Sequence, residues 1–310
     1  MKNIIVTGAA SMLGVAVIKE AISQGKKAAA VVRGGSSNNS GVCALAGANL
    51  EIIECGLQNY DSLNFDARYD AFIHLAWQST GHTARDDTYA HAQNILYALD
   101  AVNAAARAGC KAFVGAGSQA EYGIVSEKLA ADTPCNPESA YGTAKYAAGK
   151  MARLAAERLG MRSSHARILS AYGEGMSDSS LIMYVIKTLL AGGAPALTKC
   201  EQLWDFIYAG DAARALLAIA ERGADGKTYP IGSGTAKPLR GYVEEIRDII
   251  NPSIELNFGK KDYYAHQPMY LCADISELCH DTGFAPEVDF AQGIYKTVDW
   301  VKTYMPRSEK

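Results

Sequence analysis

The sequence predicts an α/β fold in which a doubly wound parallel sheet forms the larger part and a smaller mixed α/β lobe follows it. Short apolar runs alternate with longer helical stretches over residues 1–169, which is the pattern of a parallel sheet covered on both faces. The first run leads directly into a glycine-containing turn and a helix. The chain has 310 residues. Because single cores stop growing at ~250 to 300 residues, we expect two parts.

The first strand is predicted at residues 3–7, and Gly8-Ala-Ala-Ser-Met-Leu-Gly14 connects it to a helix over residues 12–24. A strand, a glycine turn and a helix together present backbone N–H groups and the positive end of a helix to a pyrophosphate. We therefore interpret this segment as a dinucleotide-binding turn rather than as a plain tight turn.

The second strand, residues 28–32, ends at Arg33, and a loop rich in glycine, serine and asparagine follows. Dinucleotide-binding folds place a carboxylate here for the ribose 2′-hydroxyl of NAD, whereas an arginine suits the 2′-phosphate of NADP. No acid is present, so the sequence favours NADP, with NAD still possible. The alternative is that Arg33 is only a solvated residue at a strand end.

A long alanine-rich helix is predicted over residues 85–108, with Gly109 as its C-terminal stop. The other strands are predicted at residues 51–54, 71–75, 111–118 and 162–169. This alternation requires right-handed crossovers and a doubly wound parallel sheet. His74 ends one of these apolar strands, where a structural histidine is commoner than a catalytic base.

Tyr141 and Lys145 lie four residues apart in a predicted helix, so they share one of its faces. A free tyrosine titrates near pH ~10, and a neighbouring ammonium favours the phenolate and brings the phenol toward the working range of an acid–base catalyst. Such a pair can occur by chance in an amphipathic helix. Ser118 favours the catalytic interpretation, because it ends a predicted strand at the edge where ligands gather in open α/β sheets.

The composition excludes several classes of partner. The formal net charge of −3 gives no basic surface for nucleic acid or an anionic membrane. Seven scattered cysteines without a C-x-x-C pair indicate neither a disulfide framework nor a metal site. The apolar N-terminal run is too short to span a membrane and lacks a signal-peptide cleavage pattern. We expect a soluble, cytoplasmic protein.

Beyond residue 170 the pattern loosens into short helices and isolated strands. Residues 202–208 are predicted to be extended, and Asp211 is predicted to cap a helix that ends near residue 221. Lys260 and Lys261 are either solvated or contact a phosphate. The predicted division assigns residues 1–169 to a dinucleotide-binding (Rossmann) domain to which 203–235 return, and residues 170–202 and 236–310 to a substrate-binding lobe.

Together these motifs resemble those of the extended short-chain dehydrogenases/reductases, the group that contains nucleotide-sugar epimerases, dehydratases and 4-keto-sugar reductases. The resemblance runs nearly end to end. It rests on Thr7-Gly8 to Gly14, His74-Leu-Ala76, Ser118 before Tyr122-Gly123, Tyr141 with Lys145, Asp205-Phe-Ile-Tyr208 with Asp211, and Ala273-Asp274. Within the group, residues 117–123, 197–202 and 272–278 look most like those of deoxysugar 4-ketoreductases.

The resemblance implies a role for each of three residues. Tyr141 would be the general acid in reduction, or the base in oxidation, at the C4 oxygen of the substrate. Ser118 would hydrogen-bond that oxygen, and Lys145 would bind the nicotinamide ribose while lowering the pKa of the tyrosine. It also implies a homodimer formed through the helices that follow the fourth and fifth strands.

Two further sets of residues follow from the same resemblance. The cofactor would be bound by Gly8, Ser11, Met12, Leu13, Gly14, Arg33, Leu57, Leu75, Ala76, Tyr141, Lys145 and Leu169. The substrate would be contacted by Trp77, Gln119, Ser170, Trp204 and Lys260.

The chain departs from the family pattern at several anchors. Ser11 replaces the middle glycine of the turn, and Cys55-Gly56 replace an acid that often meets adenine. Near the sugar diphosphate, Ser170 stands in place of an asparagine and Trp204 in place of an arginine, while another late arginine is missing near Tyr264. The missing positive charge would have to come from Lys260, Lys261 or Arg214.

Three functions remain open. The first is an NADP(H)-linked reductase of the 4-keto group of a nucleotide-activated deoxysugar, which Arg33 favours. The second is a nucleotide-sugar 4-epimerase with tightly held NAD, which would use the same catalytic residues. A dehydratase is disfavoured because Gln119 and Ala120 occupy positions where carboxylates are needed, and Glu121 should point elsewhere. The third is a non-catalytic dinucleotide-binding scaffold or sensor, which would need the glycine turn but not the serine, tyrosine and lysine.

Overall fold

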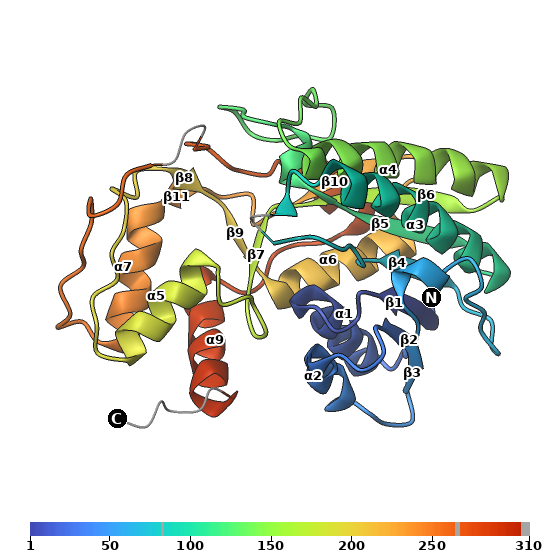
Figure 1. Cartoon of the computed structure of the whole chain (residues 1–310), viewed down its shortest axis with the longest axis horizontal. Helices are drawn as coiled ribbons and strands as arrows, with labels where there is room; N and C mark the ends of the chain where they lie inside the picture. Colours follow the sequence, from blue (N-terminus) through green and yellow to red (C-terminus); the bar gives the residue numbers. More distant parts are fainter. Residues whose placement is uncertain (82–83, 264–266, 305–310) are drawn as a thin grey trace.

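The computed structural model describes residues 1–81, 84–263 and 267–304. In these residues the main sheet has seven strands in the order β10-β6-β5-β4-β1-β2-β3, all paired in parallel (Figure 1). They are β1 (Asn3–Thr7), β2 (Lys27–Val32), β3 (Leu50–Glu54), β4 (Ala71–His74), β5 (Ala112–Ser118), β6 (Arg162–Ile168) and β10 (Thr228–Ile231). The strand order reverses between β1 and β4, so the crevice for a ligand is expected at the carboxyl ends of these two strands.

Helices cover both faces of the main sheet (Figure 1). One face carries α1 (Met12–Ser23) and α6 (Ala209–Arg222), with the short α2 (Ser40–Cys43) beside α1. The other face carries α3 (Thr88–Arg107) and α4 (Ala140–Arg158), which pack against each other. Three single 3-10 turns, η1 (Ser37–Asn39), η2 (Leu57–Asn59) and η4 (Gln119–Glu121), lie in the connections. The expected doubly wound fold is confirmed.

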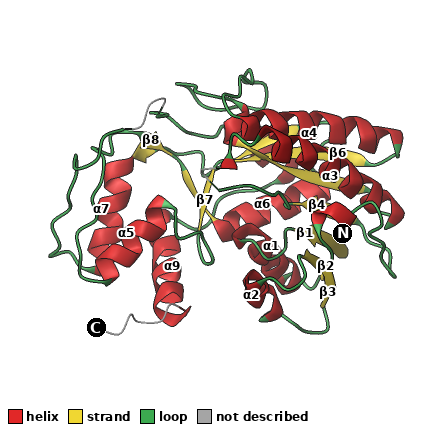
Figure 2. Ribbon diagram, in the orientation of Figure 1, coloured by secondary structure: helices red, strands yellow, loops and turns green. Residues whose placement is uncertain are grey.

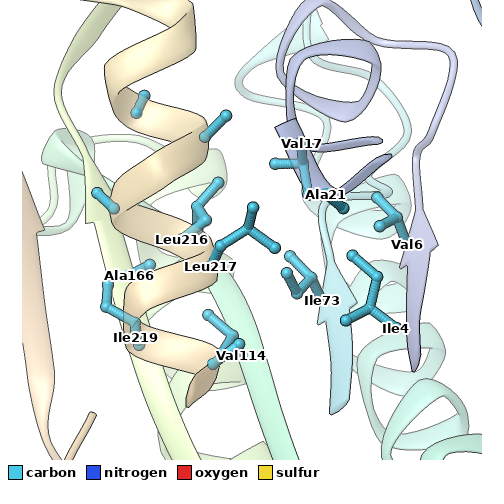
Figure 3. Close-up of a cluster of buried hydrophobic side chains, with 14 of the residues drawn as sticks. Ile4, Val6, Val17, Ala21, Ile73, Val114, Ala166, Leu216, Leu217 and Ile219 are labelled. Carbon is cyan, nitrogen blue, oxygen red and sulfur yellow. The ribbon is translucent and has the colours of Figure 1, made fainter. Parts of the chain in front are cut away.

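Successive side chains of each strand point to opposite faces of the sheet, so one strand contributes to two cores. Val6 belongs to the apolar cluster on one face, together with Ile73 and with Leu217 of α6 (Figure 3). The neighbouring Ile5 belongs to the cluster on the other face, together with Phe113. Full burial of such a side chain stabilises the fold by about 1.5–3 kcal/mol. The continuously apolar strands seen in the sequence follow from this burial on both sides.

The smaller lobe, which Figure 2 shows to one side of the main sheet, is built around a separate apolar cluster. Its helices are α5 (Leu181–Leu190), α7 (Leu239–Ile250) and α9 (Phe290–Tyr304). Two short ladders join it to the main sheet, one between β7 (Ser170–Tyr172) and β9 (Phe206–Tyr208) and one between β8 (Leu203–Trp204) and β11 (Lys237–Pro238). The lobe therefore lies beyond the carboxyl ends of the main strands.

One segment assigned to the lobe from sequence packs elsewhere. Helix α8 (Ser276–Thr282) contacts α6 and β10, and its Leu278 lies in the same cluster as the first face of the main sheet, together with Phe284. One apolar side chain in a short helix and another just after the helix gave no sign of which core they would join.

A buried aspartate links the two parts of the chain. Asp205 is 0% exposed, and its carboxylate accepts the backbone N–H groups of Ser233 at 2.8 Å, Gly234 at 3.1 Å and Ala273 at 3.0 Å. A buried carboxylate is tolerated only when such donors compensate its lost hydration. Asp205 thus ties the strand β9 region to two remote loops.

The predicted role of Asp211 as a helix cap is wrong. Helix α6 begins at Ala209, two residues earlier, and Asp211 lies in its first turn. The Asp211 carboxylate instead accepts the backbone N–H groups of Glu287 at 2.9 Å and Val288 at 3.0 Å and pairs with Arg214. The sequence could not show these partners, because two of the three lie more than seventy residues away.

In the described ranges, no helix combines the length and the apolar character that crossing a membrane requires.

Candidate active site

The predicted cofactor and catalytic residues meet at one edge of the main sheet. Gly8 follows β1, Arg33 follows β2 and Ser118 ends β5. Leu57 lies after β3, Leu75 and Ala76 after β4, and Leu169 after β6. Because these strands run in parallel, their carboxyl ends lie at the same edge, where open α/β sheets bind ligands.

The turn between β1 and α1 needs glycine at both ends. Gly8 has a φ of +66°, and a Cβ on it would lie 2.7 Å from the backbone nitrogen of Ala76. A Cβ on Gly14 would lie 2.4 Å from the carbonyl oxygen of Gly8. Ser11 begins the helix, and its hydroxyl accepts the N–H of Gly14 at 3.1 Å. The serine therefore has a local capping role that a middle glycine would not fill.

Two backbone amides at this helix end remain available to a ligand. Neither the N–H of Met12 nor that of Leu13 donates a hydrogen bond to any residue the structure describes. Free amides at the positive end of a helix are the donors that bind a pyrophosphate. The turn therefore fits a dinucleotide.

Arg33 lies exposed beyond β2, where its guanidinium approaches the Ser36 hydroxyl at 3.5 Å. The Glu54 carboxylate, at the end of the neighbouring strand, lies beside this turn, and one of its oxygens is 2.9 Å from the position of a Cβ on Gly34. The segment that directly follows β2 thus contains the Arg33 cation and no carboxylate of its own.

Ser118 and Tyr141 lie together at the centre of this edge. Ser139 caps α4, which places Tyr141 in its first turn, facing the end of β5. Burial raises the pKa of Tyr141 above its ordinary value, whereas the nearby Ser118 hydroxyl and the Arg85 guanidinium act to lower it. The structure therefore brings the predicted hydroxyl close to the phenol.

Lys145 lies on the same face of α4, and its ammonium nitrogen lies 5.9 Å from the centre of the Tyr141 ring, farther than from two other groups. Its Nζ donates to the carbonyl oxygen of Ala116 at 2.9 Å and lies 3.9 Å from the centre of the Trp77 ring. Burial lowers the pKa of Lys145 to about 7. The groups that act to lower the pKa of Tyr141 here are Ser118 and Arg85, and the effect of the Lys145 ammonium on the phenol stays a prediction.

Trp77, a predicted substrate contact, surrounds the phenol together with His91 and Arg85, which the sequence did not single out. The ring of Tyr141 lies 6.2 Å from that of Trp77 and 5.6 Å from that of His91, measured between centres. The indole N–H of Trp77 donates to His91 Nδ1 at 3.2 Å. Arg85 lies 5.2 Å above the phenol ring. Their positions depend on the loop after β4, which carries no recognisable motif.

His74 has the structural role that the sequence suggested. It is 5% exposed, and its Nδ1 hydrogen-bonds the hydroxyl of Thr7 on the adjacent strand at 2.8 Å. Burial, with a smaller contribution from the Lys145 ammonium, lowers the pKa of His74 to about 3. It therefore stays neutral at physiological pH.

The predicted substrate residues lie between the main sheet and a cavity of about 450 Å³ in the lobe. Trp204 lines this cavity, and its indole N–H donates to the hydroxyl of Ser170 at 2.8 Å. The two residues that replace the family's polar anchors thus contact each other. Lys261 lines the cavity, whereas the predicted Lys260 does not.

The remaining predicted contacts lie nearer the catalytic pair or outside the described residues. Trp77 follows β4 and covers Lys145, and Gln119 begins η4 directly after Ser118. Tyr264 lies outside the described residues.

A model of the NAD dependent epimerase/dehydratase family matches residues 4–232. The chain belongs to this family. The match includes the glycine turn, Ser118, Tyr141 and Lys145, and it confirms the resemblance to the extended short-chain dehydrogenases/reductases.

Curated members of the family show how far the similarity extends. The chain is 29% identical over 249 residues to dTDP-6-deoxy-L-talose 4-dehydrogenase (NAD(+)) of Aggregatibacter actinomycetemcomitans, a match that covers 78% of this chain and 88% of that enzyme. It is 25% identical over 310 residues to dTDP-glucose 4,6-dehydratase of Streptomyces griseus, covering 96% and 93%. With dTDP-glucose 4,6-dehydratase of Escherichia coli the match, at 28% identity, spans 53% of this chain and only 47% of that enzyme.

Solved structures of the family share the fold over nearly the whole chain. UDP-N-acetylglucosamine 4-epimerase from Methanobrevibacter ruminantium M1, in complex with UDP-N-acetylmuramic acid, superposes with a TM-score of 0.88 at 23% identity, covering 98% of this chain and 99% of that one. DesIV (dTDP-glucose 4,6-dehydratase) from Streptomyces venezuelae, solved with NAD and TYD bound, gives 0.85 at 20% identity, covering 97% of each chain.

Proposed function

We propose that the protein is an NADP(H)-linked oxidoreductase that reduces the 4-keto group of a nucleotide-diphosphate deoxysugar. The observation that carries this proposal is that Tyr141, in the first turn of α4, and Ser118, at the end of β5, come close enough at the carboxyl edge of the sheet for the hydroxyl to lower the pKa of the phenol. A relative that the chain covers to 88% of its length is a 4-dehydrogenase of a dTDP-deoxysugar, which supports chemistry at C4.

In the proposed reaction, Tyr141 donates its proton to the C4 oxygen of the substrate. Ser118 donates a hydrogen bond to the same oxygen and holds it beside the phenol. The bound cofactor supplies the hydride that C4 receives, so the carbonyl becomes a hydroxyl. The Tyr141 phenolate that remains is favoured by Ser118 and by the Arg85 guanidinium until it is reprotonated from solvent.

The chain's own residues would hold the dinucleotide in three places. The free amides of Met12 and Leu13, with Gly8, Ser11 and Gly14 shaping the turn, would bind the pyrophosphate. Leu57, Leu75, Ala76 and Leu169 would contact its rings, and Lys145 would bind the nicotinamide ribose.

We infer a preference for NADP over NAD from the end of β2. The exposed guanidinium of Arg33 can pair with a 2′-phosphate in a bidentate manner. The residues that directly follow β2 include no carboxylate to accept a ribose 2′-hydroxyl, and the Glu54 carboxylate beside them belongs to β3.

The cavity of about 450 Å³ in the lobe is the proposed place of the nucleotide part of the substrate. Its size suits a drug-sized ligand. Trp204 and Ser170 would meet the diphosphate as hydrogen-bonding groups without charge, and Lys261 would supply a positive charge from the opposite wall.

We also propose that two copies of the chain associate through α3 and α4. Leu96 on α3 is 51% exposed, and Met151 and Leu154 on α4 are 42% and 49% exposed. Because the two helices pack side by side, these apolar side chains form one surface that a second copy would cover. A cytoplasmic location agrees with the free thiols of all seven cysteines, each of which lies in the described part of the chain.

The test is turnover by the purified protein. A panel of nucleoside diphosphate 4-keto-6-deoxysugars is offered with NADPH or NADH, and loss of reduced cofactor and formation of the 4-hydroxy sugar are measured. We expect stoichiometric consumption of NADPH. Redox-neutral turnover with NAD that copurifies would instead show a 4-epimerase, and dinucleotide binding without turnover of any sugar would leave a scaffold or sensor.

A further inference from the structure

A buried group of charged side chains lies directly behind the proposed catalytic serine. Glu121 is 0% exposed and Arg167 is 3% exposed. One carboxylate oxygen of Glu121 accepts the backbone N–H of Ser118 at 2.8 Å, and the other accepts Arg167 Nε at 2.8 Å. His165 Nε2 contacts both oxygens, at 2.9 and 3.0 Å.

Two glycines on different elements keep room for this group. A Cβ on Gly117 of β5 would lie 2.4 Å from the Glu121 carboxylate and from the His165 ring. A Cβ on Gly149 of α4 would lie 2.5 Å from the same ring. Taking a carboxylate out of water is costly even when it is paired. The fold therefore keeps the ionised Glu121 carboxylate directly behind Ser118, although its burial costs hydration free energy.

Two hydrogen bonds fix the conformation of Ser118, one at its backbone N–H and one at its side-chain hydroxyl. The Ser118 N–H is held by Glu121, and the Ser118 hydroxyl oxygen accepts the N–H of Ala120 at 3.2 Å. This reciprocal pair is a capping box at the start of η4. With its backbone held in this way, the Ser118 side chain faces the phenol of Tyr141.

Glu121 cannot itself be the proton donor. Its carboxylate is enclosed by the three partners. Burial alone would raise the pKa of Glu121, but His165, Arg167 and the Ser118 N–H outweigh it and hold the pKa at about 2. A carboxylate that stays ionised and out of reach of any substrate acts only through its neighbours.

We propose that Glu121 is a positioning residue that holds Ser118 in line with Tyr141, with Arg167 and His165 fixing the carboxylate. The role rests on the proposed function, in which Ser118 and Tyr141 share the C4 oxygen. It assigns a task to a carboxylate that the sequence only suggested would point away from the site.

The test is a double-mutant cycle between Glu121→Gln and Ser118→Ala. The single remaining oxygen of the glutamine goes to Arg167, the stronger donor, so the Ser118 N–H loses its partner. We expect kcat to fall by about 10²-fold, because a displacement of about 1 Å at a catalytic group has that effect, while the KM for NADPH stays within about twofold. Adding Ser118→Ala should lower kcat by no more than about threefold further, because coupled sites are not additive.

Controls separate positioning from folding. Glu157→Gln, an exposed position on α4, should leave kcat unchanged. If Glu121→Gln does not fold, Glu121→Leu with Arg167→Leu removes both buried charges and takes its place in the cycle. Unchanged kcat, or fully additive losses with Ser118→Ala, would overturn the proposal.

A second measurement, the pKa of Tyr141, needs no substrate. It therefore tests the positioning role even if the proposed function is wrong. The phenolate absorbance of Tyr141 is titrated against a Tyr141→Phe reference, with Arg85, His91 and Lys145 near the phenol left intact. Because the Glu121 carboxylate itself raises the pKa of Tyr141, each Ser118→Ala protein is compared with its own background, the wild type or Glu121→Gln. Ser118→Ala should raise the pKa of Tyr141 in the wild-type chain, since the hydroxyl acts to lower it. It should have no effect in the Glu121→Gln background. The same rise in both backgrounds would overturn the proposal even if no 4-keto sugar were a substrate.

Discussion

Replacement of Lys145 by methionine should destroy turnover and yet stabilise the fold at neutral pH. The Lys145 side chain is 5% exposed. Its ammonium donates a hydrogen bond to the carbonyl oxygen of Ala116 and lies over the indole ring of Trp77. Burial lowers its pKa from 10.5 to about 7. At ~1.4 kcal/mol for each factor of ten, this difference corresponds to up to about 5 kcal/mol against the charged form.

The sign of the pH dependence follows from proton binding. Below pH ~7 both the folded and the unfolded lysine carry the proton, so the whole penalty is present. Between pH ~7 and ~10.5 only the unfolded lysine keeps its proton, and the free energy of unfolding of the wild type rises with pH. Relative to Lys145→Met, which lacks the group, the wild type should therefore gain several kcal/mol across this window.

Urea unfolding of the wild type and of Lys145→Met at about pH 7 and about pH 10 measures this gain. Lys150→Met, at an exposed position on the same helix, is the control, and its difference from the wild type should change by less than about 0.5 kcal/mol. A wild-type-minus-Lys145→Met difference that is the same at both pH values would refute the reasoning. The ammonium would then be neither buried nor costly.

Three other changes test separate parts of the account. Tyr141→Phe should lower kcat by about 10²-fold or more with little change in KM, as steady-state kinetics would show; undiminished turnover would exclude Tyr141 as the acid. Arg33→Ala should raise the KM for NADPH about tenfold, the equivalent of ~1.4 kcal/mol, and leave that for NADH unchanged; equal effects on both would remove the 2′-phosphate contact. Asp205→Asn places an amide against three backbone donors and should lower the free energy of unfolding by about 2–4 kcal/mol, measured by urea titration, whereas a change below about 0.5 kcal/mol would show that these donors find other partners.

Most of the main sheet could be predicted from the sequence because its signals are local. Strand β1 has the predicted bounds, and helix α1 ends one residue from the predicted end. Apolar side chains buried on both faces give continuous apolar runs. The glycines of the turn after β1 can be recognised directly in the sequence. Ser118 and Tyr141 could be paired from sequence for the same reason, since each lies at the end of a recognisable element.

The rest of the site depends on contacts that sequence spacing does not encode. Trp77 reaches Lys145 from a loop after β4, and this explains why the ammonium lies nearer the indole and Ala116 than the phenol ring. The partners of Asp211 come from a distant segment.

One signal for the buried charges was present in the sequence. His165 and Arg167 are two residues apart in β6, so they share a face of an interior strand of the sheet. Polar side chains on one face of a buried strand require a partner, but only the structure shows that it is Glu121.

The most direct test of the central claim follows a deuterium label from cofactor to sugar. The protein is incubated with NADPH deuterated at the transferable position of the nicotinamide and with a nucleoside diphosphate 4-keto-6-deoxysugar that it turns over, and the product is analysed by mass spectrometry and NMR. The account predicts one deuterium at C4 with a single configuration, and loss of this product in Tyr141→Phe. Product without deuterium at C4, or label at another carbon, would contradict it.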